Sequence, residues 1–385
     1  MKKIGILTYW SSKDNYGQLL QCYALQEYLR KKSVDPCLIK YKPNYRLSNL
    51  QLLKEVLNFN KIKSFFDGSR KRILEENEIN SKFEEEANLE SQKCRFDVFR
   101  DKYIKSTQKE YYSIDELQND VPKMDLYICG SDQVWHDDLH FKNVAGWYLQ
   151  FGEAERVSYA ASMGRRIDDK KEITLLKKYL STFKAISVRE NETAEYLKNL
   201  GFKEVITTVD PTLLLDKKDY EKFVRKENER KDYLLVYVLN IESSEDIDWE
   251  AIKEFASERC LDIRIVISSG YIPARNIFDG YCRELLTIEE WLSAMANAKY
   301  VITTSFHGTV FSLIFNRKFL AFPLKGASGA NARIESLLRL VGLDNRLVEK
   351  FDANTVMENI DWDSVRSKIV EAREQSVSFI NDNVL

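Results

Sequence analysis

The chain has 385 residues, which is more than a single hydrophobic core usually serves, so two domains are expected. Hydrophobic residues make up 44% and charged residues 31% of it, which is typical of a protein with a packed interior and a water-exposed surface. The formal net charge of −2 argues against a nucleic-acid-binding protein, because such domains are normally basic overall.

Cysteine and histidine are too scattered to predict a metal cluster or a disulfide framework. The six cysteines include no CxxC pair, and His136 and His140 stand in a loop-like context instead of on a zinc-binding helix. A reducing cytoplasm fits this cysteine usage. The apolar run at the N-terminus is too short for a secretory signal or a membrane span, and no later segment reaches 18 unbroken apolar residues. We therefore expect a cytoplasmic protein without a metal.

The N-terminal segment predicts a β-α-β unit, the building block of a parallel sheet. Lys3–Tyr9 has the pattern of a strand, Leu19–Lys31 carries apolar residues at helical spacing, and Val34–Tyr41 is a second strand. The following segment, about residues 44–110, is rich in lysine, glutamate and asparagine and predicts amphipathic helices inserted into the first domain. A solvated helical lid and a surface in peripheral contact with the inner face of the membrane would both show this pattern.

The α/β pattern then returns. Four further strands are predicted at Met124–Cys129, Arg156–Ala161, Ala185–Val188 and Val205–Val209. After a charged boundary, a second series of strands follows at Tyr233–Leu239, Ile263–Ser268, Tyr300–Thr304 and Phe319–Phe322. A final helix over about residues 362–380 is expected to return to the first domain. The sequence thus predicts an α/β fold of two Rossmann-like domains, residues 1–225 and 226–385, that face a cleft.

Polar groups follow four of these strands at their carboxyl ends, where open parallel sheets bind ligands. The first group opens the helix after the first strand, where free N–H groups favour an anion, and consists of Asn15, Tyr16, Gly17 and Gln18. The second group offers a hydroxyl and a carboxylate in a tight turn and consists of Ser131, Asp132 and Gln133. Asp132 is a candidate general base. An ordinary helix cap would explain either group without a function.

The third group contains Arg189, which ends an apolar strand. A planar guanidinium at that place suits bidentate binding of a carboxylate or phosphate, and an ion pair with Glu190 or Glu192 is the alternative. The fourth group runs from Ser305 through His307 to Gly308 and Thr309, at the start of a helix. The imidazole can contact a phosphate or move a proton near neutral pH, whereas a buried histidine held by one hydrogen bond is the alternative. Together the four groups predict a site for an anionic substrate.

Five segments, in this order, resemble the polysaccharide pyruvyl transferase family: YWSSKDNYGQLLQCYALQ, ICGSDQVW, SVRE, VDPTLLL and TTSFHGTVFSLIF. The resemblance spans Gly5 to about Arg346, with the lysine- and glutamate-rich helical segment as its variable part. It implies a GT-B-like fold, with the acceptor side in residues 1–225 and the donor side in 226–385. It also implies transfer of pyruvate from phosphoenolpyruvate onto two sugar hydroxyls as a cyclic ketal, in the biosynthesis of bacterial capsule or exopolysaccharide.

The resemblance also implies roles for single residues. His307 matches the family's donor-site histidine, and Arg189 matches its strand-end arginine. Several members carry an arginine where this chain has Ser305, so Lys325 or Arg333 is expected to replace it in donor binding, unless the substrate differs. No cofactor is expected beyond phosphoenolpyruvate as donor substrate, and the acceptor is expected to be a sugar or a lipid-linked oligosaccharide.

These residues suggest a route for the transfer. Protonation of the methylene carbon of phosphoenolpyruvate makes the neighbouring carbon electrophilic, so that a sugar hydroxyl attacks it as phosphate leaves. Arg189 and the helix start at Gly308 and Thr309 would hold the anionic groups, and His307 would bind phosphate or act as the acid. Asp132 would take the proton of the acceptor hydroxyl.

Two other functions are compatible with the sequence. A GT-B glycosyltransferase that uses a nucleotide sugar would have a similar architecture, and Glu335 would supply the acidic residue that binds a ribose. A non-catalytic carbohydrate-binding component of a polysaccharide assembly complex would use Trp10, Trp135 and Trp147 to stack on sugars. Aromatic residues at such spacings more often belong to a core.

Overall fold

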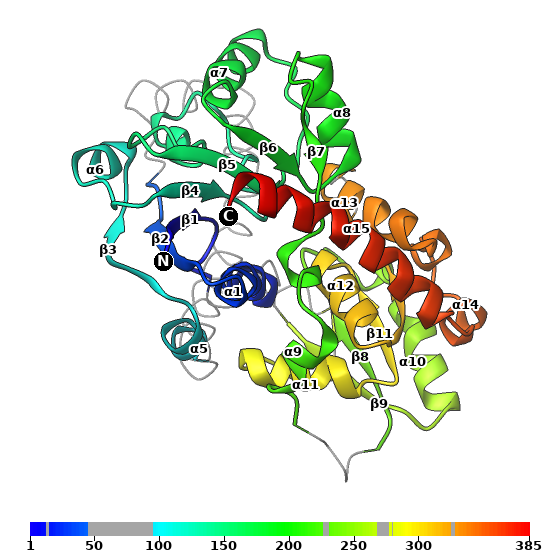
Figure 1. Cartoon of the computed structure of the whole chain (residues 1–385). Coiled ribbons are helices and arrows are strands. Elements are labelled where there is room, and N and C mark those ends of the chain that lie inside the picture. The colour runs from blue at the N-terminus through cyan, green and yellow to red at the C-terminus, as the bar shows by residue number, and fades with distance from the viewer. Residues whose placement is uncertain (13–14, 45–94, 226–230, 268–276, 279, 325–327) are drawn as a thin grey trace, which may run out of the picture.

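The chain forms two parallel β-sheets with helices packed around them (Figure 1). This computed structural model describes residues 1–12, 15–44, 95–225, 231–267, 277–278, 280–324 and 328–385. The first sheet has the order β3-β2-β1-β4-β5-β6-β7, and the second has the order β10-β9-β8-β11-β12. In both sheets every pairing is parallel.

The strands of the first sheet are β1 (Lys3–Leu7), β2 (Asp35–Tyr41), β3 (Ser106–Tyr111), β4 (Leu126–Cys129), β5 (Glu155–Ala161), β6 (Ala185–Val188) and β7 (Ile206–Thr207). Those of the second are β8 (Tyr233–Tyr237), β9 (Asp262–Val266), β10 (Arg283–Glu284), β11 (Tyr300–Thr303) and β12 (Lys318–Ala321). Each sheet has the strand order of a Rossmann fold. In such a fold the order of the strands reverses at one point, which lies between β1 and β4 in the first sheet and between β8 and β11 in the second. Ligands of such folds bind beyond the carboxyl ends of the strands at these switch points.

The described helices that follow the first strands are α1 (Tyr16–Lys31), α5 (Phe96–Tyr103), α6 (Ile114–Asn119), α7 (Lys170–Leu180), α8 (Asn191–Asn199) and α9 (Lys217–Glu221). The second sheet is accompanied by α10 (Trp249–Glu258), α11 (Ile288–Asn297), α12 (Phe306–Ile314), α13 (Ser328–Val341), α14 (Ala353–Met357) and α15 (Trp362–Asn383). None of the helices in the described part has the length and apolarity that crossing a bilayer requires.

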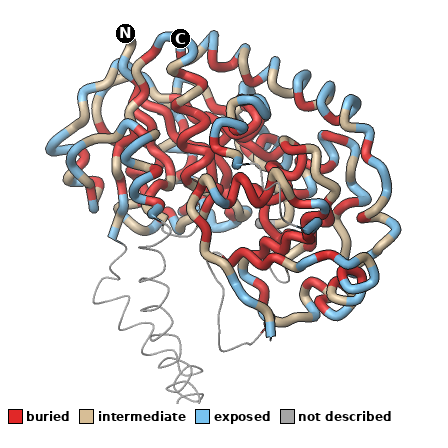
Figure 2. The backbone as a smooth tube through the Cα atoms, turned by 90° about the horizontal axis from the view of Figure 1, so that it is seen from below, coloured by how far each residue is buried: buried red, intermediate tan, exposed pale blue. Residues whose placement is uncertain are grey.

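One hydrophobic core lies between the two sheets and joins them. Because side chains alternate along a strand, Ile4 and Ile6 of β1 and Leu235 and Tyr237 of β8 all face this shared core. The opposite faces of the two sheets are buried in separate clusters. Figure 2 shows buried segments through the middle of both halves, with the exposed positions around them.

Two elements cross from one half to the other. Tyr16, at the start of α1, stacks on Trp291 of α11 with ring centroids 5.1 Å apart, and its hydroxyl accepts a hydrogen bond from the backbone N–H of Leu286. The long helix α15 packs on α13 and then runs back to the first sheet (Figure 1), where Phe379 contacts Tyr159 of β5. The predicted α/β fold of two Rossmann-like domains facing a cleft, GT-B-like and with a returning final helix, is therefore confirmed.

The structure corrects two predicted elements. Helices were predicted over about residues 44–110, and α5 lies in that range, but Ser106–Tyr111 forms the edge strand β3. Residues 45–94 lie outside the described ranges. The predicted helix at Thr309 begins earlier, at Phe306, because Ser305 caps it and accepts a hydrogen bond from the N–H of Gly308. The strands of the two sheets fall on either side of the expected domain boundary at 225/226, and that boundary itself stays a prediction.

Candidate functional site

The two switch points open onto one cleft with a volume of about 940 Å³. Its lining includes Tyr9 after β1, Asp132 after β4, Asn240 after β8 and the segment 304–307 after β11. Each of these residues follows the carboxyl end of one of the four switch-point strands. The cleft is therefore the place where a protein of this topology is expected to bind its ligand.

Two helices point their N-termini into this region. Asn15 caps α1 by accepting a hydrogen bond from the N–H of Gln18 at 3.2 Å, and Ser305 caps α12 in the same way. The first turns of both helices, which are fully described, carry no acidic residue. The positive ends of two helix dipoles thus meet without a built-in counter-charge, which favours a bound anion.

Gly17 allows the two helices to approach. A Cβ atom at this position would lie 2.1 Å from Nδ1 of His307, far inside van der Waals contact. His307 is itself only 6% exposed, and its ring meets that of Phe306 edge-on. The imidazole is thus held between the start of α1 and its own helix.

A buried carboxylate, Asp210, lies at the centre of the site. Its Oδ2 atom accepts hydrogen bonds from Arg189 Nη1 at 2.9 Å and from Ser131 Oγ at 3.1 Å. The same oxygen lies 3.7 Å from Nε2 of His307, a distance for an ion pair and too long for a hydrogen bond. The other oxygen, Oδ1, accepts hydrogen bonds from the N–H and the hydroxyl of Thr212.

The charges of this group depend on one another. Burial by itself would raise the pKa of Asp210, but His307, Arg189 and Thr212 together hold it well below its usual range. Burial would likewise lower the pKa of Arg189, but the carboxylates of Glu190, Asp210 and Asp132 outweigh that effect and raise it. Asp210 and Arg189 therefore form a fully charged buried pair.

Arg189 follows β6 of the first sheet and His307 follows β11 of the second, and both side chains contact Asp210. Arg189 does not line the cleft, however. Its guanidinium lies over the Phe306 ring, with Cζ 4.4 Å from the ring centre, and its Nε donates to Glu190 at 3.1 Å. The ion pair with Glu190, the alternative drawn from the sequence, is thus present.

The turn after β4 holds the second predicted group. Gly130 has a φ of +107°, and a Cβ there would lie 2.4 Å from the carbonyl oxygen of Tyr159. Ser131 is fully buried beneath the turn, where its hydroxyl oxygen also lies 3.1 Å from the carbonyl oxygen of Ala160. Asp132 lines the cleft, and its Oδ1 accepts a hydrogen bond from the N–H of Gln133 at 2.9 Å.

The predicted site residues divide into three sets. The cleft lining contains Asn15, Gln18, Asp132, Gln133, Ser305, His307 and Arg333. Six others lie outside this lining, in the packed layer behind it or in the neighbouring core: Tyr16, Gly17, Ser131, Arg189, Gly308 and Thr309. Lys325 lies outside the described residues.

Arg333 is the member of the predicted pair that the structure describes. It projects from α13 into the cleft, and burial together with the nearby charge of Arg189 lowers the pKa of its guanidinium to about 10. It therefore occupies a place from which it can meet an anion in the cleft.

Sequence reasoning missed several residues of the site. Asp210 belongs to the segment VDPTLLL, but no role is predicted for it from the sequence. Its position directly after the predicted strand Val205–Val209 is the signal that could have identified it as a site residue. Arg166 and Tyr196 line the cleft from the first half. Arg165 also lines it, but its guanidinium is bound to both oxygens of Glu172 and to the carbonyls of His136 and Asp137.

The aromatic residues proposed for sugar stacking lie in cores. Trp10, Trp135 and Trp147 are each at most 5% exposed. Trp135 stacks on Tyr148, with ring centroids 5.3 Å apart. None of the three lines the cleft within the described residues.

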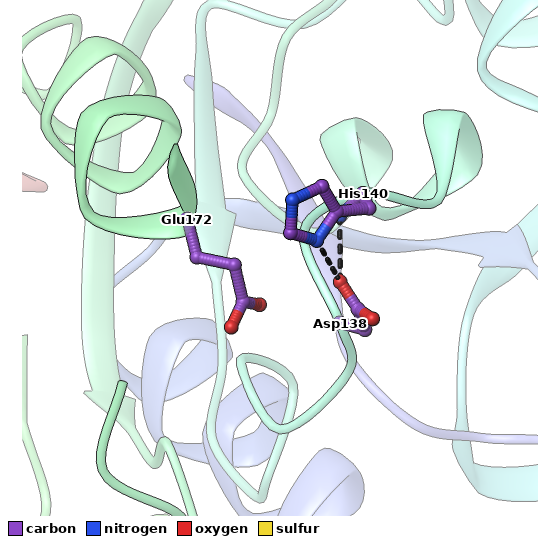
Figure 3. Close-up of side chains that lie close together, drawn as sticks. All are labelled: Asp138, His140 and Glu172. Atoms are coloured by element: carbon purple, nitrogen blue, oxygen red, sulfur yellow. Dashed lines mark hydrogen bonds and ion pairs between the residues drawn. The ribbon is translucent and has the colours of Figure 1, made fainter. Parts of the chain in front are cut away.

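One group of side chains in the described part has the spacing of a metal site: Asp138, His140 and Glu172 (Figure 3). Figure 3 shows Asp138 hydrogen-bonded to His140, with Glu172 on the facing helix. Both oxygens of Glu172 are bound by Arg165, and Oδ1 of Asp138 also accepts from the N–H of His140. A cation would have to displace the arginine, so the group fits an ion-paired loop better than a metal centre.

Comparison with known proteins assigns the chain to a family. The family model described as polysaccharide pyruvyl transferase matches residues 15–325. This chain belongs to the polysaccharide pyruvyl transferase family. The match covers α1, Asp132, Arg189, Asp210 and His307, so all the strand-end groups of this pyruvyl transferase family member lie within it. A comparison with curated proteins finds no match.

Solved structures with a similar arrangement include the Staphylococcus aureus MnaA–UDP co-structure, with a TM-score of 0.47 and 14% identity over 99% of this chain and 96% of the other. The Methanocaldococcus jannaschii UDP-GlcNAc 2-epimerase in complex with UDP-GlcNAc and UDP has a TM-score of 0.46 and 15% identity, over 98% and 93%. Arabidopsis thaliana UGT89C1 complexed with UDP-L-rhamnose has a TM-score of 0.48 and 9% identity, over 99% and 95%. The fold of this family member is assigned from the strand order of its own two sheets.

Proposed function

We propose that this protein transfers the enolpyruvyl group of phosphoenolpyruvate onto two hydroxyls of a sugar as a cyclic ketal, in bacterial surface polysaccharide biosynthesis. The family match supports pyruvyl transfer, and the observation that carries the donor assignment is the convergence of two helix N-termini without acidic residues on His307. Such a place suits a compact anion.

The donor brings roughly three negative charges, since a phosphate carries about −1.5 to −2 at pH 7 and the carboxylate adds one. Arg333 on α13 and Arg166 at the mouth of the cleft are the cations proposed to meet them. Arg166 is held by an exposed ion pair with Asp168 at 3.0 Å, which costs little to exchange for a substrate, and its Cζ lies 5.9 Å from the centre of the Tyr196 ring. Arg189 is proposed to hold the site together through Asp210.

His307 is proposed as the proton donor to the methylene carbon. As an imidazolium it would complete an ion pair with Asp210, 3.7 Å away, which positions the ring. After protonation one sugar hydroxyl attacks the adjacent carbon, phosphate leaves, and the second hydroxyl closes the ketal. Asp132 in the cleft lining is proposed to accept the proton of the first hydroxyl and pass it to the departing phosphate. The proton of the second hydroxyl would restore the His307 imidazolium, so the net products are the ketal and inorganic phosphate.

The test is phosphate release from phosphoenolpyruvate in the presence of candidate sugars and lipid-linked oligosaccharides. We expect His307→Ala to lower turnover by about 10²–10⁴-fold, the usual contribution of a general acid. His140→Ala is the matched control, because His140 is exposed and lies outside the cleft lining. Equal turnover of His307→Ala and wild type would refute the assignment.

The glycosyltransferase alternative gains no support from its one candidate residue. Glu335 is exposed on α13 and does not belong to the described lining of the cleft. Turnover with a nucleotide sugar, and none with phosphoenolpyruvate, would nonetheless favour that alternative.

A further inference from the structure

A second, smaller cavity of about 200 Å³ lies next to the cleft, and we call it the side cavity. It sits beyond the carboxyl ends of β6 and β7 and is bordered by α13 and α15. Phe306 and Arg333 line both the side cavity and the cleft, so the two are neighbours. Its volume far exceeds the roughly 10–15 Å³ that one water molecule needs on this measure.

Arginine side chains are prominent in the lining of the side cavity. Three arginines line it, Arg189 from the end of β6 and Arg333 and Arg339 from α13. Among the described lining residues Asp210 supplies the one carboxylate, and it is already bound to Arg189. Among the described residues, Arg339 is paired with the half-exposed Glu192 at 3.2 Å, an ion pair that costs little to exchange. Arg189 is paired with Glu190 as well as with Asp210, so an anion would bind here through the directed N–H groups of the arginines and not through a net positive charge.

Arg189 also has an unused donor. Its side chain is 3% exposed, and its Nη2 has no hydrogen-bond partner among the residues that the structure describes. Asp132 Oδ1 lies 3.9 Å from this nitrogen, too far to accept a hydrogen bond. Buried donors are normally paired, because leaving one unpaired is costly. The hydroxyls of Thr207 and Ser336 add polar groups to the same lining.

We propose that the side cavity is a second anion site, which binds a phosphate-sized ion such as inorganic phosphate through Arg189, Arg333 and Arg339. His307 does not line the side cavity, whereas Arg333 borders both the side cavity and the cleft. A link to catalysis rests on the proposed function: phosphate released in the cleft would lie next to this cavity, with Arg333 facing both.

The experiment is calorimetric titration of inorganic phosphate into the full-length protein without phosphoenolpyruvate. Ser336→Asp places a carboxylate in the side cavity, and Ser336→Asn is its matched control of equal size without the charge. We expect Ser336→Asp to weaken phosphate binding at this site by about tenfold or more, since an added like charge opposes the anion, and Ser336→Asn to keep it. Arg339→Gln should weaken it as well, and both variants should melt near the wild-type temperature.

A cleft variant separates the two sites. Arg166 lines the cleft but not the side cavity, so Arg166→Gln should leave the side-cavity phosphate affinity unchanged. If Ser336→Asp binds phosphate as tightly as Ser336→Asn while Arg166→Gln does not, phosphate binds in the cleft alone and the proposal is wrong. A wild-type protein that binds no phosphate would also overturn it. Failure of phosphoenolpyruvate turnover would reject the proposed function and leave this titration unaffected.

Discussion

At the scale of single residues, Asp210 organises the site. Its Oδ2 collects contacts from a turn after β4, from the end of β6 and, across the cleft, from His307 of α12. From the sequence this aspartate could be recognised as the residue after a predicted strand and as the start of a turn, because an aspartate before a proline commonly caps one. It does cap the turn, through the N–H of Thr212. The partners of Oδ2, which are Ser131, Arg189 and His307, come from distant parts of the chain, so no local sequence pattern could have revealed these contacts.

Asp210→Asn should therefore be strongly destabilising. Removing one partner of a buried ion pair costs about 3–5 kcal/mol, because the remaining charge stays buried. The measurement is the free energy of unfolding in urea at pH 7, and Asp168→Asn, which breaks an exposed pair with Arg166, should change it by no more than about 1 kcal/mol.

The pH dependence of this difference follows from the pKa of Asp210, which is lowered in the folded protein. A lowered carboxyl pKa stabilises the fold above the unfolded value of about 3.9, and that stabilisation is lost as the pH falls towards the folded pKa. The difference in the free energy of unfolding between wild type and Asp210→Asn should be largest at neutral pH and should decrease below about pH 4. A gap that is constant between pH 7 and pH 3 would contradict this.

At the scale of elements, buried strands were predictable and the exposed edge was not. β1, β4, β8 and β11 are apolar runs because both of their faces are covered, and each lies where the sequence places it. β3, with the sequence STQKEY, is mostly outside the core and carries no such pattern. α12 begins at Phe306, three residues before the predicted start at Thr309, because Ser305 caps the helix and the glycine at 308 does not interrupt it.

Gly17→Ala tests the contact between α1 and α12. Alanine at an exposed helical position would stabilise by about 1 kcal/mol relative to glycine. Here its Cβ would meet His307, so we expect destabilisation of about 1–3 kcal/mol, as in overpacked cores, together with loss of activity. Thermal unfolding and turnover are the measurements.

The double variant Gly17→Ala/His307→Ala is the control for that substitution. Removing the imidazole makes room for the new methyl group, so the double variant should be more stable than Gly17→Ala alone. If the two melt at the same temperature, the clash with His307 is not the cause.

At the scale of the whole molecule, the two sheets share one core. The stack of Tyr16 on Trp291 and the helix α15 join the halves, so we expect a single cooperative unfolding transition in scanning calorimetry. Tyr16→Ala should lower the temperature of that one transition. Two separate transitions in the wild-type protein would show that the halves unfold independently.

Donor binding should also be visible in the stability of the whole protein. Phosphoenolpyruvate at a hundred times its dissociation constant should add about 2.7 kcal/mol without any added metal, because a ligand bound only by the folded state stabilises it. That corresponds to a rise of a few degrees in melting temperature. UDP sugars should give no comparable rise, and the reverse pattern would favour a nucleotide-sugar enzyme.

The helix α15 supports the segment that carries Asp210. The N–H of Val209 donates to Ser376 Oγ at 2.9 Å, and Arg373 donates to the carbonyl of Leu213 at 2.7 Å. During synthesis on the ribosome, Asp210, His307 and Arg189 all emerge before the helix that holds their segment in place. A chain whose translation stops before residue 362 would contain every polar residue of the site without the support for their arrangement. Activity in a cell would therefore depend on translation continuing through α15.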